Sequence, residues 1–178
     1  MNSEPASPSL LKMAGMAILV LVPIVYLVIA LNTGDLIWIS PVFNARPQAI
    51  VVHCFGEDIR LNEGTQRFDE FTDLVNQSLS SSKRWDSLSL SEATYQEYQS
   101  NPQWMTLELG YAEPFRVHSP YKFFSHINTI IIPLEGRHAI TNAIFGRRGD
   151  LPAAGSFHVK TTAPLVEYLA VNGLCPQP

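Results

Sequence analysis

The sequence predicts an α+β fold: one N-terminal transmembrane helix, then a single extracytoplasmic domain with a mostly antiparallel sheet packed by two or three helices. Residues 13–31 contain no charged side chain. At about 1.5 Å rise per residue, such a helix crosses a hydrocarbon core roughly 30 Å thick. Beyond an early amphipathic helix the chain is mainly strand-like, with connections too short for crossover helices, which indicates antiparallel pairing.

The apolar segment has two interpretations, an uncleaved anchor and a cleaved secretory signal. It is longer than the apolar core of about 7–15 residues in a signal peptide, which favours the anchor, although Val28-Ile29-Ala30 resembles a cleavage site. Both interpretations export the domain. Lys12 precedes the segment and the next cation is Arg46, so the positive-inside rule places the N-terminus in the cytoplasm and the domain in the periplasm or outside the cell.

The charge balance bears on the partners of the exported part. Of the 12 Lys and Arg and 16 Asp and Glu residues, only Lys12 and Glu4 precede it, which leaves 11 against 15. This mildly acidic surface argues against nucleic acid or anionic lipid headgroups as the main partner. We expect a cytoplasmic tail of residues 1–12, a transmembrane helix of residues 13–31 within the lipid bilayer, a stalk of residues 32–48 and one α+β domain of residues 49–178.

The two cysteines, Cys54 and Cys175, predict a disulfide, because an exported domain folds in an oxidising compartment. The bond would tie the first strand to the end of the last helix. A metal site at Cys54 and its neighbour His53 is the alternative. Adjacent residues of a strand point to opposite faces, which argues against that site.

The stalk is short and stiff, since Pro41 and Pro47 restrict it, and it should hold the domain close to the bilayer. Trp38 fits the interfacial belt where indole rings lie at headgroup depth. Pro23 would kink the transmembrane helix, and a neighbouring helix could satisfy the carbonyl that it frees.

Two helices are expected in the first half of the domain. After a β-branched strand at residues 49–55, Thr65 should cap an amphipathic helix of residues 66–79 with apolar residues at steps of three and four. Ser91 should cap a second, short helix that ends before Asn101-Pro102. The serine-rich segment between them is expected to be a surface connection.

The second half of the domain is predicted to be strands followed by one helix. Residues 127–132 are the most apolar exported run and should form a central strand. Thr162 should cap the final helix, with Pro164 in its first turn and Gly173 after its end. The other strands of the domain are expected at residues 59–61, 105–111, 115–118, 139–145 and 156–161.

Four basic residues follow the expected central strand and form the densest polar cluster. They are Arg137, His138, Arg147 and Arg148. If the two loops converge, these side chains form a pocket for an anion or a carboxylate. The alternative is a turn with solvated charges and one structural ion pair.

Three aromatic residues, Tyr121, Phe123 and Phe124, lie in one loop. As an interaction feature they would form an exposed aromatic patch or a segment that enters the membrane interface. The alternative is that the loop folds back and covers the sheet.

No catalytic residue, cofactor site or metal site is predicted, because the chain lacks G-x-S-x-G, H-E-x-x-H, a glycine-rich phosphate loop and C-x-x-C. The leading hypothesis is therefore a single-pass, membrane-anchored accessory or regulatory subunit, whose partners are other membrane protein subunits. The alternative is a tethered extracytoplasmic ligand-binding or sensor domain. An enzyme with a dispersed site is the third class.

Overall fold

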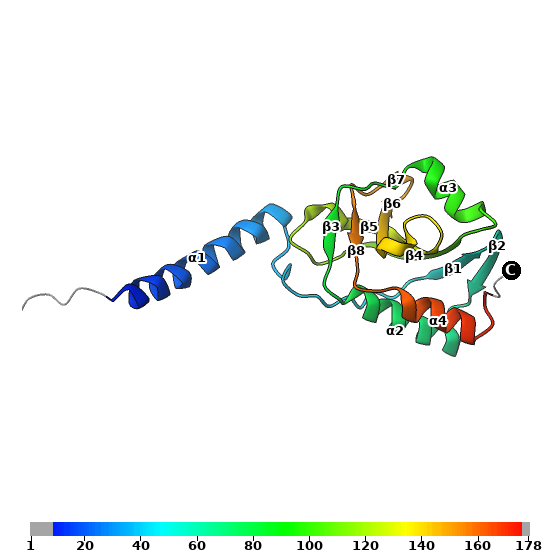
Figure 1. Cartoon of the computed structure of the whole chain (residues 1–178), viewed down its shortest axis with the longest axis horizontal. Helices are drawn as coiled ribbons and strands as arrows, with labels where there is room; N and C mark the ends of the chain where they lie inside the picture. Colours follow the sequence, from blue (N-terminus) through cyan, green and yellow to red (C-terminus); the bar gives the residue numbers. More distant parts are fainter. Residues whose placement is uncertain (1–8, 176–178) are drawn as a thin grey trace, which may run out of the picture.

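The computed structural model describes residues 9–175 and begins with helix α1 (Leu10–Thr33). The predicted transmembrane segment 13–31 lies within α1, which extends it at both ends. Figure 1 shows α1 projecting from the side of the domain. α1 is long and apolar enough to cross a membrane, and 6% of its most apolar window is buried within the chain. Most of the predicted tail, and the last three residues of the predicted domain, lie outside the described residues.

The ends of α1 are fixed by local sequence. The Ser9 side chain accepts a hydrogen bond from the Lys12 backbone N–H and so caps the first turn. Gly34 ends the helix with φ +65°, a left-handed conformation that glycine adopts without a Cβ penalty. Pro23 lies inside the helix, as predicted.

The domain is built on one eight-stranded sheet in which every pairing is antiparallel. The main path has the order β2-β1-β4-β5-β6-β8-β3, and β7 pairs with β6. β3 lies on the side of the domain nearest α1, and β2 on the far side (Figure 1). The strands are β1 (Ala49–Cys54), β2 (Glu57–Leu61), β3 (Arg84–Asp86), β4 (Met105–Arg116), β5 (Ser125–Glu135), β6 (Ala143–Arg148), β7 (Leu151–Pro152) and β8 (Ser156–His158).

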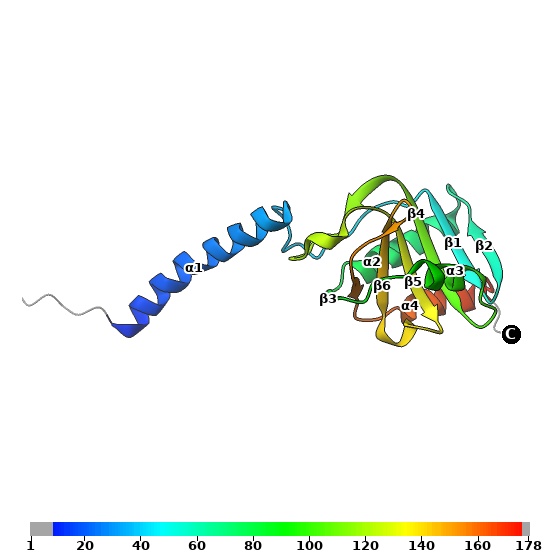
Figure 2. The ribbon, with the colours of Figure 1, turned by 90° about the horizontal axis from the view of Figure 1, so that it is seen from above.

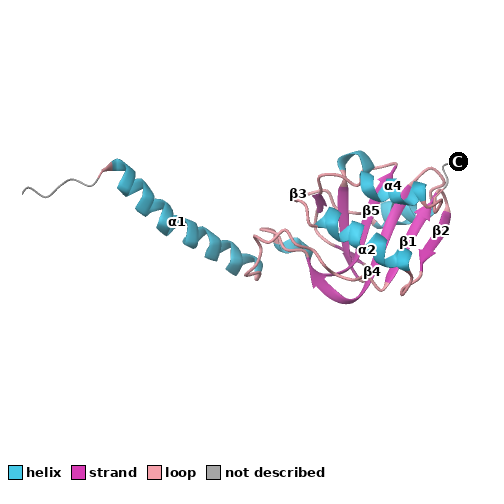
Figure 3. Cartoon of the chain, turned by 90° about the horizontal axis from the view of Figure 1, so that it is seen from below, coloured by secondary structure: helices cyan, strands magenta, loops and turns pink. Residues whose placement is uncertain are grey.

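Three helices pack on this sheet, which confirms the α+β prediction. α2 (Gln66–Leu79) and α4 (Ala163–Val171) lie across one face (Figure 3). α3 (Glu92–Ser100) lies on the opposite face (Figure 2). The boundaries of α2 agree with the predicted helix, and Thr65 and Ser91 cap α2 and α3 as expected.

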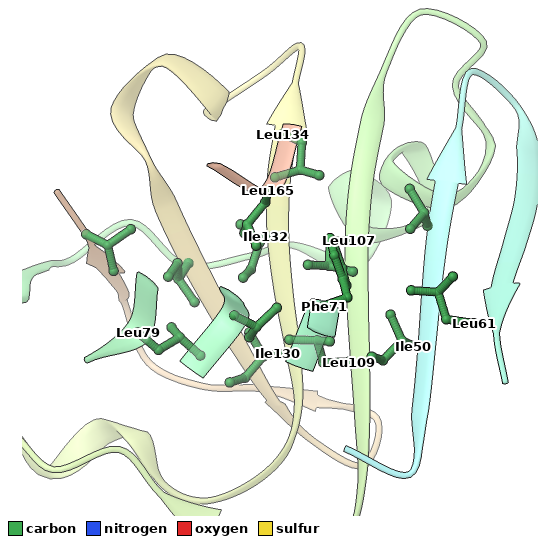
Figure 4. Packing of buried hydrophobic residues seen from close by; sticks show 14 of the residues in the cluster. Ile50, Leu61, Phe71, Leu79, Leu107, Leu109, Ile130, Ile132, Leu134 and Leu165 are labelled. Carbon is green, nitrogen blue, oxygen red and sulfur yellow. The ribbon is translucent and has the colours of Figure 1, made fainter. Parts of the chain in front are cut away.

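The main hydrophobic core lies between the sheet and the α2/α4 layer, because alternate residues of β1, β4 and β5 point to that face. A smaller cluster on the α3 side contains Leu90, Tyr98, Ile131, Ala143 and Phe145. The main core is drawn in Figure 4, where the labelled residues include Ile50, Phe71, Leu79, Leu107, Leu109, Ile130, Ile132 and Leu165.

The predicted disulfide between Cys54 and Cys175 is present and joins residues 121 apart in sequence. It links the end of β1 to the segment after α4, with a Cα–Cα distance of 5.9 Å. His53 points to the other face of the sheet, as the alternation of a strand requires. Cys54 is therefore a structural residue, and the metal alternative for this pair has no geometric support.

Three local expectations differ from the structure. Ala139–Thr141 is a short 3₁₀ helix (η2) rather than strand, because His138 and Asn142 on either side have left-handed backbones, and β6 starts only at Ala143. The Thr162 hydroxyl donates to Asn142 Oδ1 at 3.1 Å and does not cap α4. The serine-rich connection contains a strand, β3, which pairs with β8.

Candidate functional site at the junction of α1 and the domain

The last turn of α1 is hydrogen-bonded to Arg116, the last residue of β4. Arg116 Nη1 donates to the Thr33 backbone carbonyl at 2.6 Å. This carbonyl is one of those that an isolated helix leaves without a hydrogen-bond partner. The positive charge of Arg116 also interacts favourably with the negative end of the helix dipole. Gly34 lies close to the same guanidinium. The domain therefore supplies the C-terminal cap of the anchor.

A second contact follows immediately in both segments. The Asp35 carboxylate lies 3.0 Å from His118 Nδ1 and also accepts the Ile37 backbone N–H at 3.1 Å. The Asp35 side chain is 4% exposed, so a buried carboxylate is held by one histidine and one backbone donor. Together, Arg116 and His118 define what we call the anchor end of the domain.

After Asp35 the chain folds back along α1. Trp38 packs on Tyr26 with ring centroids 6.0 Å apart, and its Nε1 donates to the Tyr26 carbonyl at 3.4 Å. The Tyr26 hydroxyl donates to the Leu36 carbonyl. Leu36, Ile37 and Ile39 remain largely exposed. Trp38, predicted to lie at the membrane interface, thus contacts α1 directly.

The rest of the stalk is docked on α2. The Phe43 backbone N–H donates to the Ser80 hydroxyl at 2.9 Å, and this hydroxyl donates to the Phe43 carbonyl at 3.2 Å. The Phe43 side chain is buried against Phe115, with ring centroids 5.5 Å apart. Arg46 pairs with Asp69 at 2.6 Å. The stalk thus follows the domain surface and leaves the domain little freedom relative to α1.

The aromatic loop lies beside the anchor end and is partly folded back. Phe124 is buried and packs on Phe157, with centroids 4.3 Å apart. Tyr121 and Phe123 stack on Trp85 at 5.7 and 5.2 Å, and each is 36% exposed. One ring therefore enters the core, and two rings cover Trp85 with part of their surface open. A role of the loop in interaction stays a prediction.

Three of the four residues of the predicted anion pocket, Arg137, His138 and Arg147, contact α3. The Arg147 side chain is 5% exposed, with Nη1 3.0 Å from Glu92 Oε2, Nη2 donating to the Asp150 carbonyl at 2.9 Å, and the guanidinium 3.9 Å from the Tyr95 ring centre. Arg148 is exposed at the end of β6. Arg147 is therefore occupied by internal partners, of which Glu92 lies on α3.

Arg137 and His138 meet the other half of α3. Arg137 lies 3.9 Å from Glu97, and both side chains are more than half exposed. His138 Nδ1 lies 2.5 Å from the Tyr98 hydroxyl. Burial and the nearby charges of Arg137 and His158 lower the pKa of His138. The anion pocket stays a prediction. The contacts of Arg137, His138 and Arg147 with α3 give these three residues a structural role, because they hold α3 on the sheet.

A polar network on the same face was not foreseen. His53 Nδ1 lies 2.7 Å from Asp58 Oδ1, and its Nε2 lies 3.1 Å from Glu108 Oε2. Glu108 also accepts hydrogen bonds from Tyr95 at 2.9 Å and Gln99 at 3.1 Å. A neutral imidazole has a single N–H, so only the imidazolium form donates to both carboxylates.

The network shifts the pKa values of its members. Burial alone would lower the pKa of His53, but the hydrogen bonds and charges of Glu108 and Asp58 outweigh it and raise that pKa. Burial would raise the pKa of Glu108, but its bonds to His53, Gln99 and Tyr95 lower it. Burial, with Glu108 nearby, raises the pKa of Tyr95 to about 12. The His53 side chain is 7% exposed, and the network fixes α3 on the sheet through Tyr95 and Gln99.

No metal centre emerges from these side chains. Within residues 9–175, no group of three or more His, Cys, Asp and Glu residues is arranged to hold a metal ion. Comparison with protein-family models, with characterised proteins and with solved structures gives no match, so the residues themselves are the basis for function.

Proposed function

We propose that the chain is a single-pass, membrane-anchored accessory or regulatory subunit of a membrane protein complex, and that its exported domain acts by protein–protein interaction. The observation that carries the proposal is the bonded junction, in which Arg116 holds the Thr33 carbonyl and His118 holds the Asp35 carboxylate. A simple tether needs no specific contact with the domain that it carries. Because hydrogen bonds join α1 to the domain at this junction, a displacement of α1 would also move β4 and the rest of the sheet.

The surface of α1 supports a role beside other membrane helices. Between residues 13 and 31 its side chains are apolar on all sides and nearly all exposed within the chain, so they are available to lipid or to another helix. Pro23 has no N–H to give to the Leu19 carbonyl, and a neighbouring helix can satisfy that carbonyl.

The test is gentle detergent extraction of the chain from its native membrane, followed by the mass and composition of the particle. We expect stoichiometric companions. Arg116→Ala should weaken their association, because it uncouples the domain from α1. Arg60→Ala, an exposed arginine on β2 at the far side, is the matched control. A solitary monomer in every mild detergent would refute the subunit proposal.

A tethered ligand-binding or sensor domain is the second candidate, favoured by one groove of about 400 Å³. It contains three cations and a histidine and no acidic residue. The lining side chains are Ser82, Lys83, Arg84, Thr141, His158, Val159 and Lys160. A small anion at 100 times its dissociation constant should add about 2.7 kcal/mol to the free energy of unfolding. A thermal-shift series with small anions, on the wild type and Lys160→Gln, separates this candidate from the first.

A further inference from the structure

We propose that the junction binds one anionic glycerophospholipid, with an acyl chain in an apolar groove along α1 and the phosphate group at Lys83. This inference rests on the proposal that α1 spans a membrane. It adds a ligand and a binding site to that proposal.

The apolar half of the site is a groove of about 260 Å³ between α1 and the segment that folds back on it. The lining contains no charged residue. It is made by Leu21, Val22, Val25, Tyr26, Trp38 and Ile39. Residues 21–26 lie seven to twelve positions before the end of α1, which is about 10–18 Å along the helix. Counted from the end of α1, that depth falls within a hydrocarbon core roughly 30 Å thick, so an acyl chain is the occupant available there.

The polar half is a second groove of about 290 Å³ that shares Trp38 and Ile39 with the first. It lies between the stalk and the anchor end of the domain. Its other lining residues are Ser40, Pro41, Ser81, Ser82, Lys83, His118, Ser119 and Pro120. The two grooves are therefore adjacent, and the lining changes from apolar to hydroxyl-rich and basic with distance from α1. A phospholipid changes in the same order from its chains to its headgroup.

Lys83 is the residue in this groove that we expect to bind the anionic phosphate group. Its Nζ donates to the backbone carbonyls of Pro41 at 3.1 Å and Ser81 at 3.4 Å, which leaves one of three N–H donors unused. Burial lowers the pKa of Lys83, and no acidic side chain among the described residues opposes this effect. The Ser82 hydroxyl, one residue before Lys83, makes no hydrogen bond within residues 9–175. A phosphate oxygen would accept from both groups.

The local charge selects an anionic lipid over a zwitterionic one. Neither groove is lined by Asp or Glu, and the Asp35 carboxylate beside them is already held by His118. A choline headgroup would find no partner for its cation there. The exported part as a whole is acidic, so its net charge predicted the opposite preference, whereas the lining of this groove includes Lys83 and no Asp or Glu.

The experiment uses the full chain, purified in mild detergent and mixed with phosphatidylglycerol, phosphatidylcholine or inorganic phosphate, with retained lipid measured by native mass spectrometry. The wild type should retain one phosphatidylglycerol in preference to phosphatidylcholine. Lys83→Gln should weaken this retention about tenfold, the effect of one hydrogen bond to a charged group. Lys122→Gln, an exposed lysine in η1 (Lys122–Phe124) that lines neither groove, should not change it.

A second variant tests the apolar half. Val25→Trp places a large side chain in the groove and should also release the lipid, whereas Val28→Trp, at an exposed position of α1 outside the groove, should not. Both changes lie on the lipid-facing helix, so the disulfide-linked domain stays folded in each.

Three results would overturn the site. These are equal retention of both lipids, retention unchanged by Lys83→Gln, and displacement of the lipid by millimolar phosphate, which would indicate a site for small anions only. Release of the chain from its membrane by alkaline carbonate would refute the membrane anchor together with the site. A chain that resists carbonate but shows no lipid preference would refute the lipid site alone.

Discussion

Arg116 and Thr33 are 83 residues apart in sequence, yet the Arg116 guanidinium caps the last turn of α1 by donating to the Thr33 carbonyl at 2.6 Å. Asp35 and His118 lie two residues further along each segment. The two contacts together make α1 and the sheet one mechanical unit. The geometry of this junction depends on Gly34, whose left-handed backbone turns the chain directly after the capped Thr33 carbonyl.

Replacing Arg116 should loosen this unit without unfolding the domain. Arg116→Ala removes one charge-assisted hydrogen bond, a loss of about 1.5–3 kcal/mol at the junction. Spin labels on α1 and β2 should report a broader distance distribution in Arg116→Ala and an unchanged one in Arg60→Ala. A narrow distribution in both variants would mean that the stalk alone fixes the geometry.

The disulfide should dominate the stability of the domain. Cys54→Ser, Cys175→Ser and the double variant should each lower the free energy of unfolding by about 4–5 kcal/mol, because the bond closes a loop of 121 residues in the unfolded chain. Denaturant unfolding of the three variants measures this. Equal losses of unfolding free energy in the three variants would show that the two cysteines stabilise the domain only through their bond. Alkylation of both thiols in the native protein would contradict the bond itself.

The His53–Glu108 pair should give the domain a maximum of stability in mild acid. The raised pKa of His53 contributes stability that is complete below its ordinary value of 6.5 and is lost as pH rises through the folded pKa. The lowered pKa of Glu108 contributes stability that is complete above its ordinary value of 4.5 and is lost as pH falls. Both contributions are therefore complete between pH 4.5 and 6.5.

Variants at histidine test this pH profile. His53→Gln should remove the decline on the alkaline side, measured by urea unfolding across pH 4 to 9. His126→Asn is the control, because His126 is exposed and asparagine tolerates its left-handed backbone. A profile that His53→Gln leaves unchanged would assign the pH dependence to other groups.

Substitutions at the adjacent residues Arg147 and Arg148 distinguish a structural role from anion binding. Arg147→Met keeps the aliphatic stem but removes the bonds to Glu92 and to the Asp150 carbonyl, so it should cost about 1–3 kcal/mol. Arg148→Met, at an exposed position, should stay within about 0.5 kcal/mol. Thermal unfolding measures both. Equal stability of the two variants, with loss of sulfate-induced stabilisation in each, would instead favour the predicted anion pocket.

Local patterns in the sequence were enough for most of the fold. α2 could be predicted to the residue because its cap, Thr65, and its apolar stripe from Phe68 to Leu79 are encoded within fifteen positions. The disulfide followed from cysteine count and compartment alone. The central position of β5 followed from an apolar run of β-branched residues, which is typical of a strand buried on both faces.

The candidate site could not be predicted in the same way, because its contacts are distant in sequence. Arg116 and His118 have no local feature that assigns them to Thr33 and Asp35. Arg147 was identified as a cation of interest, but its carboxylate partner Glu92 lies on α3, and only the packing of that helix brings them together. β3 was missed because three residues carry too little periodicity to distinguish a strand from a loop.

The position of the disulfide also determines how the domain would respond to force. A pull applied at Cys175 passes through the bond to Cys54 at the end of β1, along β1 to the stalk, and so to α1. This covalent path bypasses the stretch from β2 to α4, which joins it only through noncovalent contacts such as Arg116–Thr33 and the pairing of β1 with β4. Tension between the membrane and a partner held near Cys175 would therefore pass to residues 34–54 once the contacts at Thr33 and Asp35 had broken, and strands beyond β4 would keep their pairing while the load lasts.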